Sequence, residues 1–192
     1  MTINGEFPPN LRPLSPHDRL QGKVNPEKNT RVCEGSDEPY AVKPSIHLGV
    51  SSQTDVFELY LKHPKNGGYI QHQPNSQFAW TLAVVLRQAL ADIHGINADE
   101  TGYTVKASTI EGCSFPISTI VLFDKCGGGA GFSSASPQYI KTMLQKASTY
   151  LDCPDACESA CQSCLLGYDT RFHVGLLDRN SVVEYLNEIT PL

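Results

Sequence analysis

The sequence predicts an α/β or α+β fold in which a mixed sheet is flanked by helices, with a four-cysteine knuckle near the C-terminus. Three observations lead to this fold class. Runs of β-branched and aromatic residues typical of strands occur throughout the second and third quarters of the chain. They alternate with segments that carry apolar residues at helical spacing. Four of the seven cysteines then lie close together, between Cys153 and Cys164.

Residues 1–44 differ in composition from the rest of the chain. They contain more than half of the 13 prolines, and their apolar residues follow no sustained period. Proline fixes φ and removes a backbone donor, so such a segment disfavours helices and central strands. We therefore divide the chain into a proline-rich extended or irregular segment, residues 1–44, and a folded domain, residues 45–192.

Four segments of the folded domain are predicted to be strands. Residues 55–61 alternate so that Phe57, Leu59 and Leu61 share one side, as in a half-buried strand. Residues 117–124 are apolar almost throughout, which is typical of a strand buried on both faces. The other two predicted strands are residues 46–50 and 103–108.

Three helices are predicted. Residues 77–94 carry apolar side chains around most of the helix circumference, so we expect this helix to be largely buried. Residues 137–151 follow Ser136 as an N-cap and begin with proline, which is favoured at the first helical position. A capping-box pattern at residues 181–184 predicts a last helix that ends at Ile189.

Composition narrows the classes of function. The formal net charge of −5 argues against a surface that coats nucleic acid, although it allows a local basic patch. No apolar run approaches the ~20 residues that span a bilayer, and no signal peptide pattern is found. An odd number of cysteines does not suggest a secreted disulfide framework. We expect a cytoplasmic protein with reduced thiols and no membrane partner.

The cysteine cluster is the most informative feature of the chain. If residues 157–164 are helical, Cys157, Cys161 and Cys164 share one face and Cys153 lies just before the helix. Four thiolates can close a tetrahedral shell around Zn²⁺. Disulfides or unengaged thiols are the alternative without a metal. We predict Zn²⁺ as a structural cofactor, because a closed shell leaves no coordination position for water.

An iron–sulfur cluster is the competing interpretation. The spacing from Cys157 to Cys164 matches the three-cysteine motif of radical S-adenosylmethionine enzymes. Only 28 residues follow Cys164, too few to build the barrel of those enzymes, and Cys153 would fill the iron position that must stay open. A four-cysteine [4Fe–4S] cluster without radical chemistry stays open as an alternative.

A glycine-rich loop follows the predicted buried strand. Its glycines permit positive φ and close backbone approach, so its amides could hold phosphate or another anion. The pattern is neither a Walker A loop nor a dinucleotide fingerprint. A tight turn is the favoured interpretation, with Asp124 as a loop-capping residue. The candidate anion or ligand site consists of Asp124, Gly127, Gly128, Gly129 and Gly131.

Taken in order, the motifs resemble the MrfA-type zinc-binding domain. The resemblance rests on Thr54–Val56, Ala79–Leu82 with Ala89–Leu90, Leu122–Asp124 with the glycine loop, the four cysteines, and Leu177–Arg179. It covers residues 46–190. Such domains occupy the C-terminal part of large superfamily 2 helicases in DNA repair, and of anti-phage defence proteins of the DISARM DrmB type. The resemblance implies that Cys153, Cys157, Cys161 and Cys164 are the zinc ligands.

The chain departs from those helicases in one respect. They carry Walker A and DEAD-type motifs in separate motor domains, and neither motif occurs here. We therefore expect a non-catalytic, zinc-stabilised accessory domain that contacts a helicase motor in cis or in trans, a partner protein or DNA. The acidic balance favours a protein partner over autonomous DNA binding.

A hydrolase or nuclease is the remaining alternative. Asp124, Asp169, His173 or Asp178 could serve it, but their spacing is not diagnostic of any catalytic constellation. His173 is more easily explained as a packed or surface residue, and Asp178 with Arg179 as a charge pair that anchors the loop.

Overall fold

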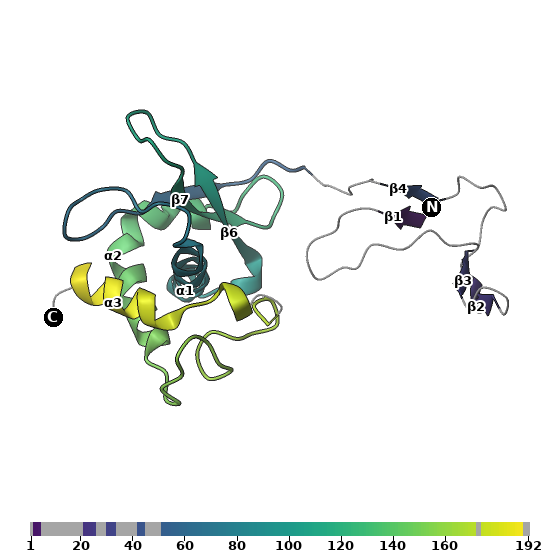
Figure 1. Cartoon of the computed structure of the whole chain (residues 1–192). Helices are drawn as coiled ribbons and strands as arrows, with labels where there is room; N and C mark the ends of the chain where they lie inside the picture. The colour runs from purple at the N-terminus through teal and green to yellow at the C-terminus, as the bar shows by residue number, and fades with distance from the viewer. Residues whose placement is uncertain are drawn as a thin grey trace. The chain divides into compact units, whose positions relative to one another are not determined.

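The computed structural model describes residues 51–171 and 174–189, together with four short strands nearer the N-terminus. The chain divides into two compact units, Met1–Ser51 and Ser52–Leu192, which are described separately (Figure 1). The division into domains at residues 44 and 45 stays a prediction, and the strand expected at residues 46–50 lies outside the described residues.

The first unit contains two strand pairs. β1 (Thr2–Asn4) pairs in parallel with β4 (Val42–Pro44). β2 (Gln21–Asn25) pairs antiparallel with β3 (Thr30–Cys33). The proline-rich segment is thus extended at these four places.

The second unit is an α+β fold built on a three-stranded sheet. β5 (Val56–Tyr60), β6 (Thr101–Ser108) and β7 (Ile117–Asp124) are arranged in the order β5-β7-β6. Both pairings are antiparallel, where the sequence led us to expect a mixed sheet. The reason lies in the connection between β6 and β7, because residues 109–116 are too few for the crossover that a parallel pair requires.

The strand pairing places one apolar face of the sheet against the helices. Leu59 and Val105 both lie opposite Ile120, and Phe57 and Tyr103 both lie opposite Leu122. All of these side chains belong to or pack on the buried core. The alternation predicted for residues 55–61 is therefore confirmed.

Helix α1 (Ser76–His94) is the centre of the core. Twelve of its 19 residues are buried, as predicted for a helix that is apolar around most of its circumference. It contacts β6, β7, α2 and α3, and Figure 1 shows it nearly end-on with those elements around it. The helix ends at Gly95, whose φ of 66° allows the Ile96 N–H to reach the Ala91 carbonyl at 3.0 Å.

Helix α2 (Phe132–Leu151) begins five residues before the predicted start. Pro137 lies inside the helix and Ser136 is buried, so the prediction of Ser136 as N-cap and Pro137 as first helical residue is wrong. A carboxylate from the end of β7 binds the first amides of the helix instead, as described below. This long-range cap overrides the local proline signal.

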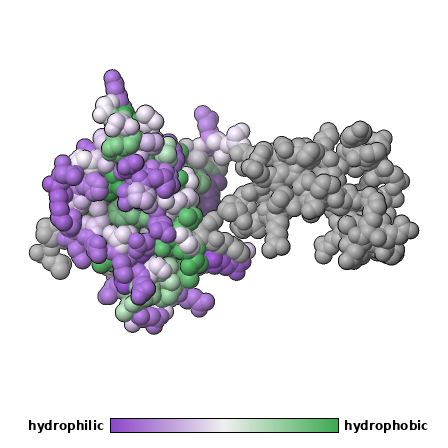
Figure 2. Space-filling view, viewed as in Figure 1, coloured by the Kyte–Doolittle hydropathy of each residue, from purple (hydrophilic) through white to green (hydrophobic). Residues whose placement is uncertain are grey.

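Helix α3 (Arg179–Ile189) begins two residues before the predicted capping box. The Ser181 N–H donates to the Asp178 carboxylate at 3.2 Å, so Asp178 caps the helix. Among the described residues, no helix combines the length and apolar character needed to cross a bilayer. Figure 2 shows mainly hydrophilic side chains on one face of the second unit, with smaller hydrophobic areas between them.

Candidate metal centre

The four clustered cysteines meet at one point between the end of α2 and the start of α3. Their sulfur atoms all lie within 4.8 Å of one another. Cys153 Sγ is 3.4 Å from Cys161 Sγ, and Cys164 Sγ is 3.5 Å from Cys157 Sγ and 3.7 Å from Cys161 Sγ. A tetrahedron with Zn–S bonds of about 2.3 Å has sulfur–sulfur edges of about 3.8 Å. The cluster therefore has the size of a shell around one ion.

Two tight turns, rather than a helix, bring the sulfur atoms together. The Ala156 N–H donates to the Cys153 carbonyl at 3.0 Å, and Ala156 has a positive φ of 46°. In the second turn, the Cys161 carbonyl accepts the Cys164 N–H at 3.2 Å, while the Cys161 N–H points to Cys164 Sγ at 3.4 Å. The helical arrangement considered for residues 157–164 does not form, because these local turn bonds replace the helical ones.

Arg179 joins the four-cysteine knuckle, residues 153–164, to the helical core. Its Nε donates to the Cys157 carbonyl at 2.9 Å and its Nη1 to the Leu151 carbonyl at 2.8 Å. Its backbone N–H donates to the Ser159 carbonyl at 2.9 Å. Arg179 thus anchors the loop through carbonyl groups instead of the expected charge pair with Asp178. The two side-chain contacts of Arg179 join residues more than 20 positions apart, and no spacing in the sequence predicts such contacts.

The thiols differ in their tendency to ionise. The backbone N–H of Cys157 lowers the pKa of the Cys153 thiol to about 7, against the opposing effect of burial. Burial raises the pKa of the Cys164 thiol to about 12, and burial also raises the pKa of Cys157. A bound dication would favour the thiolate at every position, since it attracts four negative charges at once.

The donor set and its size fit zinc. Four thiolates around Zn²⁺ form a closed structural site. In a [4Fe–4S] cluster each cysteine binds a different iron atom, so the four sulfur atoms must lie farther apart than around a single ion. The separations of 4.8 Å or less favour a single ion. Such a zinc would carry no open position for a substrate or water.

The same geometry defines a class of protein, a zinc-knuckle module on an α+β core, and part of the chain is similar to a known family. Residues 82–165, which include all four cysteines, match the family model of the MrfA Zn-binding domain. The resemblance predicted from the sequence and the prediction of structural Zn²⁺ are thereby confirmed.

Comparison with solved structures finds similarity to a DUF1998 helicase MrfA in a crystal structure with bound DNA. The TM-score is 0.42 at 12% sequence identity, and the match covers 78% of this chain. It spans only 27% of the helicase chain. No curated protein sequence matches this chain.

The glycine loop after β7 is occupied by two carboxylates of the chain itself. Asp124 is 1% exposed and accepts the N–H groups of Ala130, Phe132 and Ser133 at 2.8, 3.2 and 2.9 Å. The Ser133 hydroxyl donates to it at 2.7 Å. Burial alone would raise the pKa of Asp124, but these four hydrogen bonds hold it below its ordinary value.

The second carboxylate, Asp55, accepts the Gly131 N–H at 2.9 Å. Gly129 has a φ of +79°, and a Cβ there would lie 2.4 Å from the Asp55 carboxylate. The loop residues Gly127 and Gly128 complete the turn, in which the Gly128 N–H reaches the Gln53 carbonyl at 2.8 Å. These contacts make the loop a tight turn that anchors α2. An anion site formed by Asp124, Gly127, Gly128, Gly129 and Gly131 stays a prediction.

The carboxylates considered for catalysis each take part in a different structural interaction. Asp124 caps α2, Asp178 caps α3, and Asp169 pairs with Arg87 at 2.8 Å. His173 lies outside the described residues. These three carboxylates therefore do not share one site that would favour the nuclease alternative.

Proposed function

We propose that this chain is a non-catalytic, zinc-stabilised accessory domain of a DNA helicase-type system that acts in DNA repair or antiviral defence. The observation that carries this proposal is the four-sulfur cluster, which lies inside the stretch that matches the MrfA Zn-binding domain. The ligands are Cys153, Cys157, Cys161 and Cys164. A closed thiolate shell supports folding and offers no site for hydrolysis.

The domain would contact a helicase motor, in cis or in trans, and nucleic acid held by that motor. It would act in the cytoplasm, where its thiols stay reduced. The metal would contribute by fixing the loop between α2 and α3, which presents polar and aromatic side chains to a partner. Structural zinc in small motifs supplies on the order of 10 kcal/mol of folding free energy, enough to hold such a loop.

The proposal is tested by isolating the zinc-loaded chain from its native cells with its bound proteins and identifying them by mass spectrometry. We expect a helicase-type protein to copurify with the parent and to be lost with Cys161→Ser. Purified alone, the chain should not hydrolyse ATP with or without DNA. ATP hydrolysis by the chain alone, or copurification that is unchanged in the Cys161→Ser variant, would contradict the proposal.

A further inference from the structure

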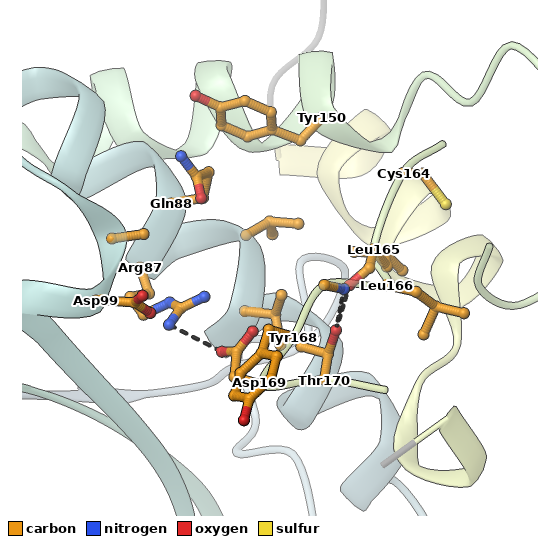
Figure 3. A pocket seen from close by; sticks show the side chains of 14 residues that line it. Arg87, Gln88, Asp99, Tyr150, Cys164, Leu165, Leu166, Tyr168, Asp169 and Thr170 are labelled. Atoms are coloured by element: carbon orange, nitrogen blue, oxygen red, sulfur yellow. Dashed lines mark hydrogen bonds and ion pairs between the residues drawn. The ribbon is translucent and has the colours of Figure 1, made fainter. Parts of the chain in front are cut away.

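A hollow of about 300 Å³ adjoins the metal centre. It lies between α1, the short 3₁₀ helix Ala98–Glu100, the end of α2 and the loop that follows Cys164, which itself forms part of the wall. Figure 3 shows Gln88 and Tyr150 across the hollow from Tyr168 and Asp169, with Arg87 between the two sides. This volume is at the lower end of the range for ligand pockets and is large enough for one flat ring.

One nitrogen of a buried arginine in the pocket wall lacks a hydrogen-bond partner. Arg87 is only 6% exposed, and its Nη1 lies 2.8 Å from Asp169 Oδ2. Its buried Nε has no hydrogen-bond partner, and the ion-paired Asp169 Oδ2 makes no well-directed hydrogen bond. An unsatisfied buried donor beside an ion-paired carboxylate favours a ligand whose edge offers an acceptor to that donor.

An exposed aromatic ring lies beside this polar pair. Tyr168 is 80% exposed, the most exposed of the large apolar side chains described. The guanidinium of Arg171 lies 4.2 Å from its ring centroid. A planar cation on one side of the ring leaves the other side as a stacking surface, and stacking on an aromatic ring together with arginine is the usual mode of single-strand binding.

The loop that carries Tyr168 is held in place before any ligand arrives. Thr170 is 1% exposed, and its hydroxyl donates to the Leu165 carbonyl at 2.8 Å while it accepts the Gly167 N–H at 2.7 Å. The Arg171 N–H closes the turn on the Gly167 carbonyl at 3.1 Å. A loop whose backbone is already fixed loses little conformational freedom on binding, so this loop is preorganised to present Tyr168.

We propose that this pocket binds one unstacked base of a single-stranded nucleic acid, with the base stacked on Tyr168 and its edge facing Arg87 and Asp169. The inference rests on the proposed function, because it specifies the nucleic-acid contact of the accessory domain. A base combines a flat face with a donor and an acceptor on one edge, a combination that an aliphatic side chain lacks. Since the net charge is −5, stacking rather than phosphate attraction carries the affinity.

The test measures binding of a fluorescein-labelled single-stranded oligodeoxynucleotide to the full zinc-loaded chain by anisotropy. Tyr168→Ala is compared with Tyr168→Phe, which keeps the ring, and with Tyr60→Ala, which removes a tyrosine that is 45% exposed on β5. Zinc content is measured for each variant to show that the knuckle is intact. An oligonucleotide of the same length with abasic sites tests the base itself.

We expect Tyr168→Ala to weaken binding about tenfold, the usual effect of losing one stacked base, with Tyr168→Phe and Tyr60→Ala unchanged. The abasic strand should bind the parent as weakly as the normal strand binds Tyr168→Ala. Equal affinity of Tyr168→Ala and the parent would overturn the pocket assignment. So would Tyr168-dependent association with a helicase motor without any binding of single strands, which assigns the pocket to a protein side chain. Neither result would alter the zinc content of the parent or its copurification with a helicase-type protein, on which the proposed accessory role depends.

Discussion

The sheet with α1 and the knuckle between α2 and α3 are stabilised by different means. Twelve of the 19 residues of α1 are buried against the sheet and the other helices. From residue 152 to residue 178, burial is confined to Cys153, Leu165, Thr170 and Leu177 among the described positions. Apolar burial therefore maintains the first region, whereas the second depends on a metal and a small set of hydrogen bonds. Perturbations should separate the two regions.

Loss of one zinc ligand should have the largest effect and should be confined to the knuckle. Cys164→Ser removes a thiolate from a site worth on the order of 10 kcal/mol of folding free energy. We expect rapid proteolysis within residues 152–178 and slow proteolysis of α1 and the sheet. Cys126→Ser is the control, since Cys126 is exposed and lies outside the cluster. A Cys164→Ser variant as resistant as the parent would show that zinc does not maintain this region.

Removal of the Asp124 carboxylate should destabilise the core and leave zinc binding intact. Asp124→Ala leaves three amides and a hydroxyl at the start of α2 without their acceptor, at a cost of about 3 kcal/mol. Urea unfolding followed by circular dichroism measures the change. Glu111→Ala, at an exposed position, should change stability little. A loss of zinc in Asp124→Ala without a change in unfolding would contradict the separation of the two regions.

The same carboxylate predicts a pH dependence. Its folded-state pKa is lowered below the ordinary 3.8, so its stabilising contribution is present above pH ~4 and is lost as the pH falls through the folded-state value. The difference in stability between the parent and Asp124→Ala should therefore shrink when unfolding is measured at pH 3 instead of pH 7. Acid release of zinc affects both proteins and cancels in the difference. A difference that grows on acidification would contradict the assigned role.

Arg179 connects the two regions, and its replacement should show how tightly they are coupled. Arg179→Gln removes the bonds to the Cys157 and Leu151 carbonyls, which we expect to cost about 2 kcal/mol. Zinc transfer to a chelator should become faster while the circular dichroism of the helices is retained. Lys65→Gln removes only a surface ion pair with Glu188 on α3 and should leave both quantities unchanged.

The glycine loop offers a smaller and more local test. Gly129→Ala introduces a Cβ that would meet the Asp55 carboxylate at 2.4 Å, at a φ of +79°, and should cost about 1–3 kcal/mol. Gly127→Ala is the matched control, because nothing lies within 4 Å of its Cβ. Equal unfolding midpoints for the two variants would show that the close contact between Gly129 and Asp55 is not required.

The difference between the apolar core and the knuckle also explains which features the sequence could predict. The bounds of β7 and the burial of α1 follow from apolar periodicity, and the clustering of the four proposed ligands follows from cysteine spacing, because these signals are local. The start of α2 could not be predicted, since its cap comes from Asp124 on a strand and Pro137 gave a misleading local signal. The turns of the knuckle and the contacts of Arg179 depend on partners distant in sequence. The amino-acid sequence of one protein does not show which distant residues come into contact.

The central claim is that one zinc ion on four thiolates maintains the knuckle, and the metal content of anaerobically purified protein tests it most directly. Elemental analysis and a visible absorption spectrum are measured on the same sample. We predict one zinc per chain in a colourless protein, lost on Cys161→Ser. Iron with a brown chromophore would contradict the zinc assignment and would make an iron–sulfur cluster the group that the four cysteines hold.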